Sequence, residues 1–370
     1  MVPSWSYQTH EGVVCRGWSI RANAYASGIG YGHECLLYST RTQEVKPLSA
    51  HVSLPWTLTE AIAWADVVSW EHEAIPADVI AAAHDKFLMD PSRIKSLTDR
   101  RAEKKLFDDC RVATSPWQSY GTPAELEKLL RQTTQPLVLK AARGGYDGKG
   151  QWRFRPGDDI AECVAEAGKE PGIAEHLIPF EKEVSLVGAR GKDGSVRCYP
   201  LTTNVHTQGI LSYSLGGIDV VPEALQKQAE QAFHRLTDAL SYVGVFAIEF
   251  FVVEASGQTQ LLINEVAPRV HNSGHWTMSG ANCSQFDLHM RALTGMPFPE
   301  LRIEPTLMLN VIGAKQIPAG LWHHQDAQCH WYNKEPRPGR KVGHVNVRTA
   351  NPDTALSWVK QWAEKLQLLA

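Results

Sequence analysis

The stretch GVFAIEFFVVEASGQTQLLINEVAP, residues 244–268, holds two apolar runs separated by a turn at 256–257, and this pattern predicts an antiparallel hairpin. Each predicted strand carries one carboxylate, Glu249 or Glu265, and such a group is costly to bury unless it meets a cation. A three-residue loop would set the two carboxylates opposite each other, whereas a two-residue loop would put Asn264 opposite Glu249. The sequence leaves this register open. It favours Mg²⁺ bridging nucleotide phosphates over the alternative of two exposed strand glutamates.

The segments around this hairpin alternate between predicted strands and helices. Thr122, Pro123 and Glu125 form the start of a capping box, and residues 136–142 (PLVLKAA) predict a strand. Further strands, hairpins and helices are predicted at 65–70, 76–83, 184–206 and 222–243. This rhythm predicts an α/β fold in which a second domain begins near residue 104.

The composition is that of a soluble globular protein, with 43% hydrophobic and 21% charged residues among 370. A formal net charge of -3 provides no basic field for nucleic acid. No apolar run reaches the length of a membrane span, and the start of the chain lacks the features of a secretion signal. The seven cysteines form no CxxC pair, which favours reduced thiols in a cytoplasmic protein over a zinc site or a disulfide framework.

A glycine-rich stretch follows the predicted strand that ends in Lys140. Residues 140–151, KAARGGYDGKGQ, contain four glycines and the cations Arg143 and Lys149. Glycines let backbone N–H groups close over phosphate oxygens, although glycine-rich hairpin turns are also common. No GK[ST] ending follows, so the stretch is not a Walker loop.

Two later stretches concentrate hydrogen-bond donors and cations. Directly after the hairpin, APRVHNSGHW (267–276) brings Arg269 and His271 into a loop, where we interpret them as ligands of a small anion. HNSGH lacks the spacing of a zinc motif. KEPRPGRKVGH (334–344) surrounds a Pro-Gly turn with four cations, which suits a phosphate monoester, with a solvated basic surface as the alternative.

Several segments, taken in order, closely resemble 5-(carboxyamino)imidazole ribonucleotide synthase, an ATP-grasp enzyme family of bacterial purine biosynthesis. They are GGYDGKGQW, EVSLVGARG, NVHTQGIL, INEVAPRVHNSGHWT, SQFDLHMRALTG and NKEPRPGRKVGH. The resemblance implies an α+β ATP-grasp fold with a Rossmann-like pre-ATP-grasp domain (1–103), an ATP-grasp domain (104–296) and a small C-terminal domain (297–370). It also implies a cytoplasmic homodimer. The implied reaction joins ATP, bicarbonate and 5-aminoimidazole ribonucleotide through carboxyphosphate.

The resemblance also implies roles for individual residues. Arg269, His271 and Asn272 would surround bicarbonate and carboxyphosphate, and Glu249 and Glu265 would hold Mg²⁺. The ribonucleotide would be bound by Glu73, Tyr146, Lys149, Lys334 and Arg340. The ATP contacts would be Arg100, Lys140, Gly145, Tyr146, Asp147, Gly148, Lys149, Gly150, Gln151, Glu175, His176, Leu177, Ile178, Glu183, His206, Asn264 and Glu265.

Two other functions are compatible with parts of the chain. One is another ATP-grasp ligase of purine synthesis, such as the formate-dependent glycinamide ribonucleotide transformylase, which the segments HNSGHW and RPGRK disfavour. The other is a non-catalytic ATP-binding protein.

The N-terminus departs from the family, which opens with a strand and a GxGQLG loop. Residues 16–30, RGWSIRANAYASGIG, match neither. Codons that spell residues 18–28 can be chosen so that the next reading frame encodes GQLGRMLTQAG, and residues 10–13 likewise shift to MKVW. We therefore hypothesise that residues 1 to about 35 come from the wrong frame. The first parallel strand and its glycine turn would then be lost, and ribonucleotide-dependent turnover would be weak or absent while some ATP binding remains.

Overall fold

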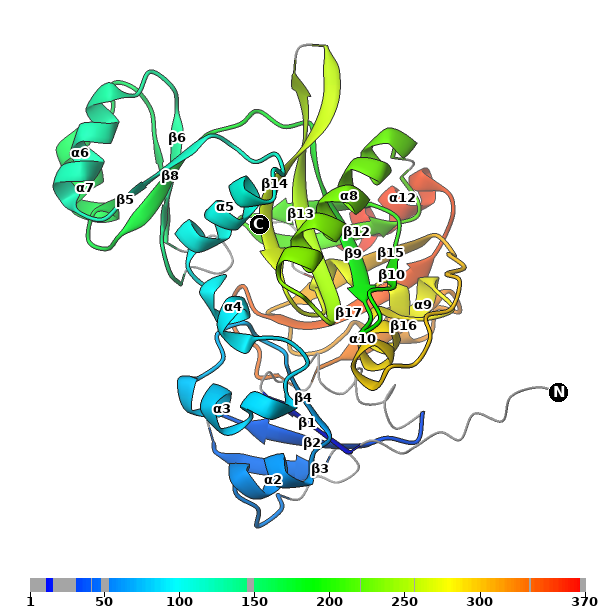
Figure 1. Ribbon diagram of the computed structural model, residues 1–370. Coiled ribbons are helices and arrows are strands. Elements are labelled where there is room, and N and C mark those ends of the chain that lie inside the picture. The colour runs from blue at the N-terminus through cyan, green and yellow to red at the C-terminus, as the bar shows by residue number, and fades with distance from the viewer. Residues whose placement is uncertain are drawn as a thin grey trace.

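Three sheets organise the chain in the computed structural model, as far as the described residues show (Figure 1). These residues are 11–15, 31–40, 42–47, 53–144, 150–219, 221–255, 257–332 and 334–366. Helices flank the sheets, so the predicted α/β fold is confirmed. Within the same residues, no helix has both the length and the apolar composition that crossing a membrane requires.

The N-terminal sheet has the strand order β3-β2-β1-β4, and β1 runs parallel to both β2 and β4. The prediction that the first parallel strand is lost is therefore wrong for the backbone, because β1 occupies the centre of this sheet. The expected glycine turn, within residues 16–30, lies outside the described residues. The strands are β1 (Glu11–Cys15), β2 (Glu34–Ser39), β3 (Glu44–Pro47) and β4 (Val67–Trp70), and the helices that follow them are α2 (Leu58–Trp64), α3 (Ala77–Ala82), η1 (His84–Lys86) and α4 (Pro91–Ser96).

A second four-stranded sheet, the small sheet, projects from the body of the molecule with the order β5-β8-β6-β7 (Figure 1). Leu126 and Leu130 of α6 pack against its buried side chains, and Thr122 caps that helix as predicted. The preceding helix, α5 (Arg100–Asp109), spans the position where we expected a domain boundary. The elements of this unit are β5 (Trp117–Tyr120), α6 (Pro123–Gln132), β6 (Leu137–Ala141), β7 (Gln151–Phe154), α7 (Ile160–Ala167) and β8 (Gly172–His176).

The central sheet is the largest, and its main path runs β14-β13-β9-β11-β12-β15-β17-β16, with β10 paired to β9. The C-terminal strands β15, β16 and β17 extend this sheet, since β15 pairs with β12. The strands are β9 (Lys182–Arg190), β10 (Val196–Cys198), β11 (Thr202–Thr207), β12 (Ile210–Gly216), β13 (Gly244–Ala255), β14 (Gln258–Ala267), β15 (Thr306–Ile312), β16 (Ala327–Trp331) and β17 (Lys341–Arg348).

Helices cover both faces of the central sheet, because side chains along β13 alternate between two cores. Phe246 lies in one core with Phe233 of α8, and Val245 lies in the other with Phe286 of α10. The helices of this region are α8 (Glu223–Ala239), η2 (Asn272–Gly274), α9 (Thr277–Gly280), α10 (Gln285–Thr294), α11 (Ala319–Trp322) and α12 (Pro352–Trp362).

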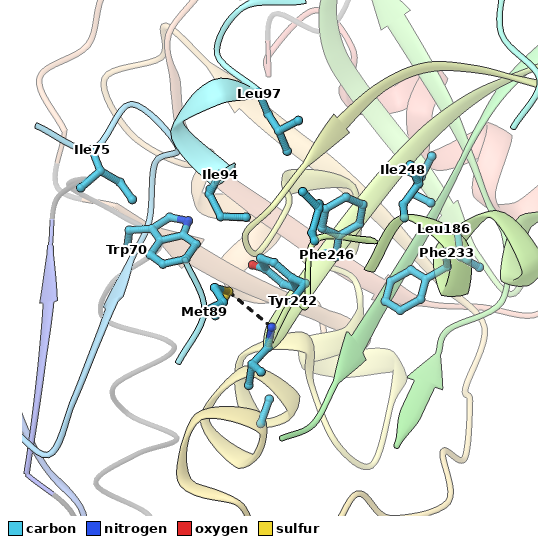
Figure 2. Close-up of a cluster of buried hydrophobic side chains, with 14 of the residues drawn as sticks. Trp70, Ile75, Met89, Ile94, Leu97, Leu186, Phe233, Tyr242, Phe246 and Ile248 are labelled. Carbon is cyan, nitrogen blue, oxygen red and sulfur yellow. Dashed lines mark hydrogen bonds between the residues drawn. The ribbon is translucent and has the colours of Figure 1, made fainter. Parts of the chain in front are cut away.

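The N-terminal domain and the central sheet share one apolar core. Figure 2 shows Trp70 of β4 and Met89 beside Tyr242 and Phe246. Polar contacts cross the same boundary: the Trp70 indole N–H donates to the carbonyl of Pro268 at 3.0 Å, and Ser69 Oγ lies 3.1 Å from His289 Nε2. The end of β4 is therefore held against the segment that follows β14.

Candidate functional site

The hairpin of β13 and β14 places Glu249 directly opposite Glu265. Its loop has two residues, because Ala255 pairs with Gln258, and that loop alone would have put Asn264 opposite Glu249. A β-bulge between Glu249 and Phe250 shifts the register by one residue and brings the carboxylates together. The structure thus settles the register through a bulge that neither predicted alternative included.

A cavity of about 810 Å³ lies over this hairpin, and all three parts of the fold contribute to its walls. Most predicted site residues line it: Glu73, Arg100, Lys140, Gln151, Glu175, His176, Leu177, Ile178, Glu183, His206, Glu249, Asn264, Glu265, Arg269, His271, Asn272 and Lys334. Gly150 and Arg340 are described but are not among the lining residues. The predicted contacts at Gly145, Tyr146, Asp147, Gly148 and Lys149 lie outside the described residues.

Negative charge gathers at one end of the cavity. Burial and the nearby Glu265 carboxylate raise the pKa of Glu249 to about 7. A pair of carboxylates that repel each other while facing a cavity fits a divalent cation with oxygen ligands, so the structure is compatible with the predicted Mg²⁺ site. Beside this pair, His206 lies 3.2 Å from Glu183. Burial lowers the pKa of His206, but the Glu183 contact and the Glu249 charge outweigh that effect and raise it overall.

Lys140 is held by a buried network that joins the small sheet to α5. Its Nζ lies 2.5 Å from Glu175 Oε2, and Lys104 Nζ lies 2.5 Å from the other oxygen of the same carboxylate. Burial alone would raise the pKa of Glu175, but the two ammonium groups hold it below its usual range. Lys104 is 1% exposed and also donates to Thr114 Oγ1 at 2.6 Å. The Glu175 carboxylate therefore holds both lysines in place at the cavity wall.

Arg100 holds the start of the glycine-rich stretch. Its Nη1 donates to the carbonyl oxygens of Ala141 and Gly144, each at 2.7 Å. Arg143, at the same turn, lies 3.3 Å from Asp99 Oδ2. These contacts anchor the C-terminal end of β6 to the N-terminus of α5.

The turn after β14 carries the predicted anion ligands. Arg269 Nε donates to Glu73 Oε2 at 2.9 Å, and this charge outweighs the effect of burial and lowers the pKa of Glu73. Asn272 exchanges two amide hydrogen bonds with the buried Asn310, of 3.1 and 2.7 Å. His271 Nε2 lies 3.4 Å from Glu249 Oε1. All three predicted catalytic residues therefore line the cavity, and His271 contacts the acidic pair.

The turn after β14 is followed by a tightly packed tryptophan, Trp276. Trp276 is 1% exposed, and its indole N–H donates to Thr202 Oγ1 at 3.1 Å. Gly216, at the end of β12, lies against the ring so closely that a Cβ there would be 2.1 Å from Trp276 Cδ2.

Several lining residues were not predicted. Lys341 lines the cavity, whereas its neighbour Arg340 donates to the carbonyl of Glu335 at 3.1 Å. Phe180 and Phe251 stack at 4.6 Å on the cavity wall. Glu103 Oε1 accepts a hydrogen bond from the backbone N–H of Val266 at 3.0 Å. The basic stretch 334–344 predicted a cation near the ligand. Whether Arg340 or Lys341 lines the cavity depends on the pairing of β17 with β15, which the sequence does not show.

A nucleotide-sized cavity between two antiparallel sheets, with a lysine on one sheet and paired carboxylates on the other, defines the class of ATP-grasp ligases. The family profile described as the ATP-grasp domain matches residues 105–286. A second profile, described as the phosphoribosylaminoimidazole carboxylase C-terminal domain, matches residues 306–357.

Known proteins narrow the class to one family. An N5-carboxyaminoimidazole ribonucleotide synthase of Vibrio parahaemolyticus is 47% identical over 313 residues, which cover 82% of this chain and 81% of the relative. A crystal structure of such a synthetase with ADP has a TM-score of 0.84 at 28% identity and covers 97% of this chain and 96% of its own. The enzyme from Aspergillus clavatus, in complex with ADP and 5-aminoimidazole ribonucleotide, has a TM-score of 0.83 at 25% identity, covering 97% and 99%. The chain belongs to the N5-carboxyaminoimidazole ribonucleotide synthase family, which confirms the resemblance found in the sequence.

Proposed function

We propose that this chain carboxylates 5-aminoimidazole ribonucleotide with bicarbonate at the expense of ATP, through carboxyphosphate, in de novo purine biosynthesis. The products are 5-(carboxyamino)imidazole ribonucleotide, ADP and phosphate. One observation carries the proposal: a single cavity joins the lysine network, the acidic pair, the Arg269 turn and the cations of the basic stretch. The substrate complex of the Aspergillus clavatus relative supports the choice of ribonucleotide.

The nucleotide would lie between the small sheet and the central sheet. Lys140 and Arg100 would meet its phosphates, the backbone of residues 175–178 would meet the adenine, and Glu183 would accept the ribose hydroxyls. Phe180 and Phe251 offer an apolar surface for the base. Glu249, Glu265 and Asn264 would hold Mg²⁺, which, when bound, neutralises charge on the transferred phosphoryl group.

Bicarbonate would bind at the Arg269 turn. There Arg269 supplies a fixed positive charge, and His271 and Asn272 supply hydrogen bonds. A bicarbonate oxygen would attack the γ-phosphorus and release ADP. The ribonucleotide amine would then attack the carboxyl carbon of carboxyphosphate, and inorganic phosphate would leave with a proton from the amine.

The ribonucleotide would occupy the neighbouring part of the cavity, near Glu73 and Lys334, with Tyr146, Lys149 and Arg340 assigned by the family resemblance. Lys341 is a further candidate for its phosphate, because it lines the same wall. We also propose a homodimer that works in the cytoplasm. Among the described residues, Cys35, Cys110, Cys163, Cys198, Cys283 and Cys329 are free thiols, and unpaired cysteines are common in cytoplasmic proteins.

The test is ADP release from the purified full-length chain. It is measured with ATP and Mg²⁺ alone, then with bicarbonate and 5-aminoimidazole ribonucleotide, then with formate and glycinamide ribonucleotide. Dependence on the first pair supports the proposal, and dependence on the second would reassign the chain to the transformylase reaction. ATP binding without stimulation by either pair would indicate a non-catalytic protein.

A further inference from the structure

A continuous chain of buried polar side chains ends at His271. Ser214 Oγ donates to Asn204 Oδ1 at 2.7 Å, and Asn204 Nδ2 donates to Ser185 Oγ at 2.9 Å. Ser185 Oγ donates to Ser273 Oγ at 2.7 Å, and Ser273 Oγ lies 2.8 Å from His271 Nδ1. The three serines are fully buried, and Asn204 is 4% exposed. The side chains therefore satisfy one another where water does not reach them.

The central sheet builds this chain through its register. Asn204 of β11 pairs directly with Ser214 of β12, so their side chains share one face. Ser185 of β9 pairs with Thr202, two residues before Asn204, and so belongs to the same face. Three adjacent strands thus lead to the turn that contains Ser273 and His271.

The hydrogen bonds run in one direction. Ser185 donates its hydroxyl proton to Ser273, which leaves the Ser273 hydroxyl proton for His271 Nδ1. The backbone N–H of Ser273 also points to Nδ1, at 3.4 Å. Both groups are donors, so Nδ1 acts as the acceptor and the ring proton belongs on Nε2.

The backbone of His271 is fixed independently. Gln285 Oε1 accepts the His271 backbone N–H at 2.9 Å, and Gln285 Nε2 donates to the His271 carbonyl at 2.8 Å. Gln285 is fully buried. With the backbone clamped in this way, the serine and asparagine chain is left to determine the state and orientation of the ring.

We propose that Ser273, Ser185, Asn204 and Ser214 are positioning residues that hold His271 as the tautomer protonated on Nε2. His271 then presents an N–H donor, rather than a basic nitrogen, to the oxygens of bicarbonate and carboxyphosphate. This inference rests on the proposed function for its catalytic meaning, although the tautomer itself does not. The two donors at Nδ1 are compatible with a neutral ring, and Nε2 lies 3.4 Å from Glu249 Oε1, so its proton points to the acidic end of the cavity.

The experiment is NMR of the full-length chain labelled with ¹⁵N-histidine, using two-bond ¹H–¹⁵N correlations at neutral pH. The His271 signals are identified by their loss in His271→Asn. We expect the pattern of a ring protonated on Nε2, with Nδ1 as the unprotonated nitrogen. A pattern with the proton on Nδ1 would overturn the proposal, whether or not the chain turns over its substrates.

Variants then test the chain of serines. Ser273→Ala should produce a mixture of tautomers and lower kcat about tenfold, with the KM for ATP unchanged, and Ser273→Thr should restore both readouts. Ser185→Ala interrupts the chain one step further away and should cause a smaller shift in the same direction. The control is Ser212→Ala on β12, whose hydroxyl donates to Thr207 and should leave the His271 signals as they are.

Two results would separate this proposal from the proposed function. An Nε2 tautomer in a chain without ribonucleotide-dependent turnover would support the positioning role and contradict the reaction. Normal turnover, with the same pure tautomer in Ser273→Ala and Ser185→Ala as in the unaltered chain, would show that the serines do not position His271.

Discussion

Glu249 shares the acidic end of the cavity with Glu265, and its charge is opposed by burial and by that neighbour. Replacing it by Gln keeps the shape and removes one carboxylate of the proposed Mg²⁺ site. If the proposed Mg²⁺ site is correct, we expect Glu249→Gln to lower ADP release about a hundredfold, equivalent to about 3 kcal/mol of lost charge stabilisation. The measurement is a coupled ADP assay over a range of Mg²⁺ concentrations. The matched control is Glu254→Gln, on the same strand but exposed. Unchanged turnover in Glu249→Gln would show that Glu249 does not bind the metal ion.

Lys104 is the residue whose role could not be anticipated from the sequence. It carries no motif, and it contacts Glu175, 71 positions later in the chain (175 − 104), only because α5 lies beside β8. Removing one partner of a buried ion pair leaves the other uncompensated. We expect Lys104→Met to lower the unfolding midpoint by about 5 °C and to raise the KM for ATP. Lys105→Met is the control, because Lys105 is exposed and its ion pair with Asp109 lies on the surface. Equal midpoints for the two variants would contradict the structural role of Lys104.

At the scale of elements, the hairpin and the amphipathic helices followed from residue patterns alone. The position of the bulge in β13 and β14 did not, because a bulge depends on how the strands meet the rest of the sheet. The course of α5 across the expected domain boundary was also missed, since a helix carries no mark of the domain to which it belongs. In the basic stretch, the Pro-Gly turn was anticipated, and Gly339 adopts a φ of 73°. The sequence did not show that Lys341, at the start of β17, lines the cavity while the adjacent Arg340 does not.

The sequence in and after the N-terminal strand β1 can be tested by restoring the family residues. The backbone of β1 is in place, so we expect the cost of the unusual sequence to fall on the segment that follows it. A variant carrying MKVW at 10–13 and GQLGRMLTQAG at 18–28 should show higher ribonucleotide-dependent turnover than the chain as it stands. ATP binding, measured by calorimetry, should differ little between the two. Equal turnover would show that the unusual N-terminal sequence does not reduce activity. Codons that cannot encode the alternative segment would show that no change of reading frame took place.

For the whole molecule, His289 links the N-terminal domain to the central sheet. Its Nε2 meets Ser69, its Nδ1 accepts the backbone N–H of Val245 at 3.1 Å, and burial lowers its pKa to about 4. The unfolded chain takes up this proton near pH 6.5, before the folded chain does. Stability from this group is therefore present above about pH 6.5 and is lost as the pH falls towards 4, by about 3 kcal/mol in total.

This pH dependence can be isolated by substitution. His289→Gln should be less stable than the unaltered chain at pH 7.5, and the difference should shrink as the pH is lowered from 6.5 to 4.5. Thermal unfolding at each pH provides the measurement, and His234→Gln, at an exposed site on α8, provides the control. A constant difference across this range would show that His289 does not titrate on unfolding.

The contact between Gly216 and Trp276 limits how this protein can change over evolutionary time. Even alanine at position 216 would drive a methyl group into the indole, and the ring has no room to retreat, because Thr202 holds its N–H and Tyr199 packs edge-on at 5.8 Å. Any drift at this position would displace the turn that carries His271 and Asn272. In a library covering every amino acid at 216, built in the variant with the repaired N-terminus and selected for growth without added purines, glycine should be the sole survivor, so Gly216 would vary as little as the residues proposed to bind substrate.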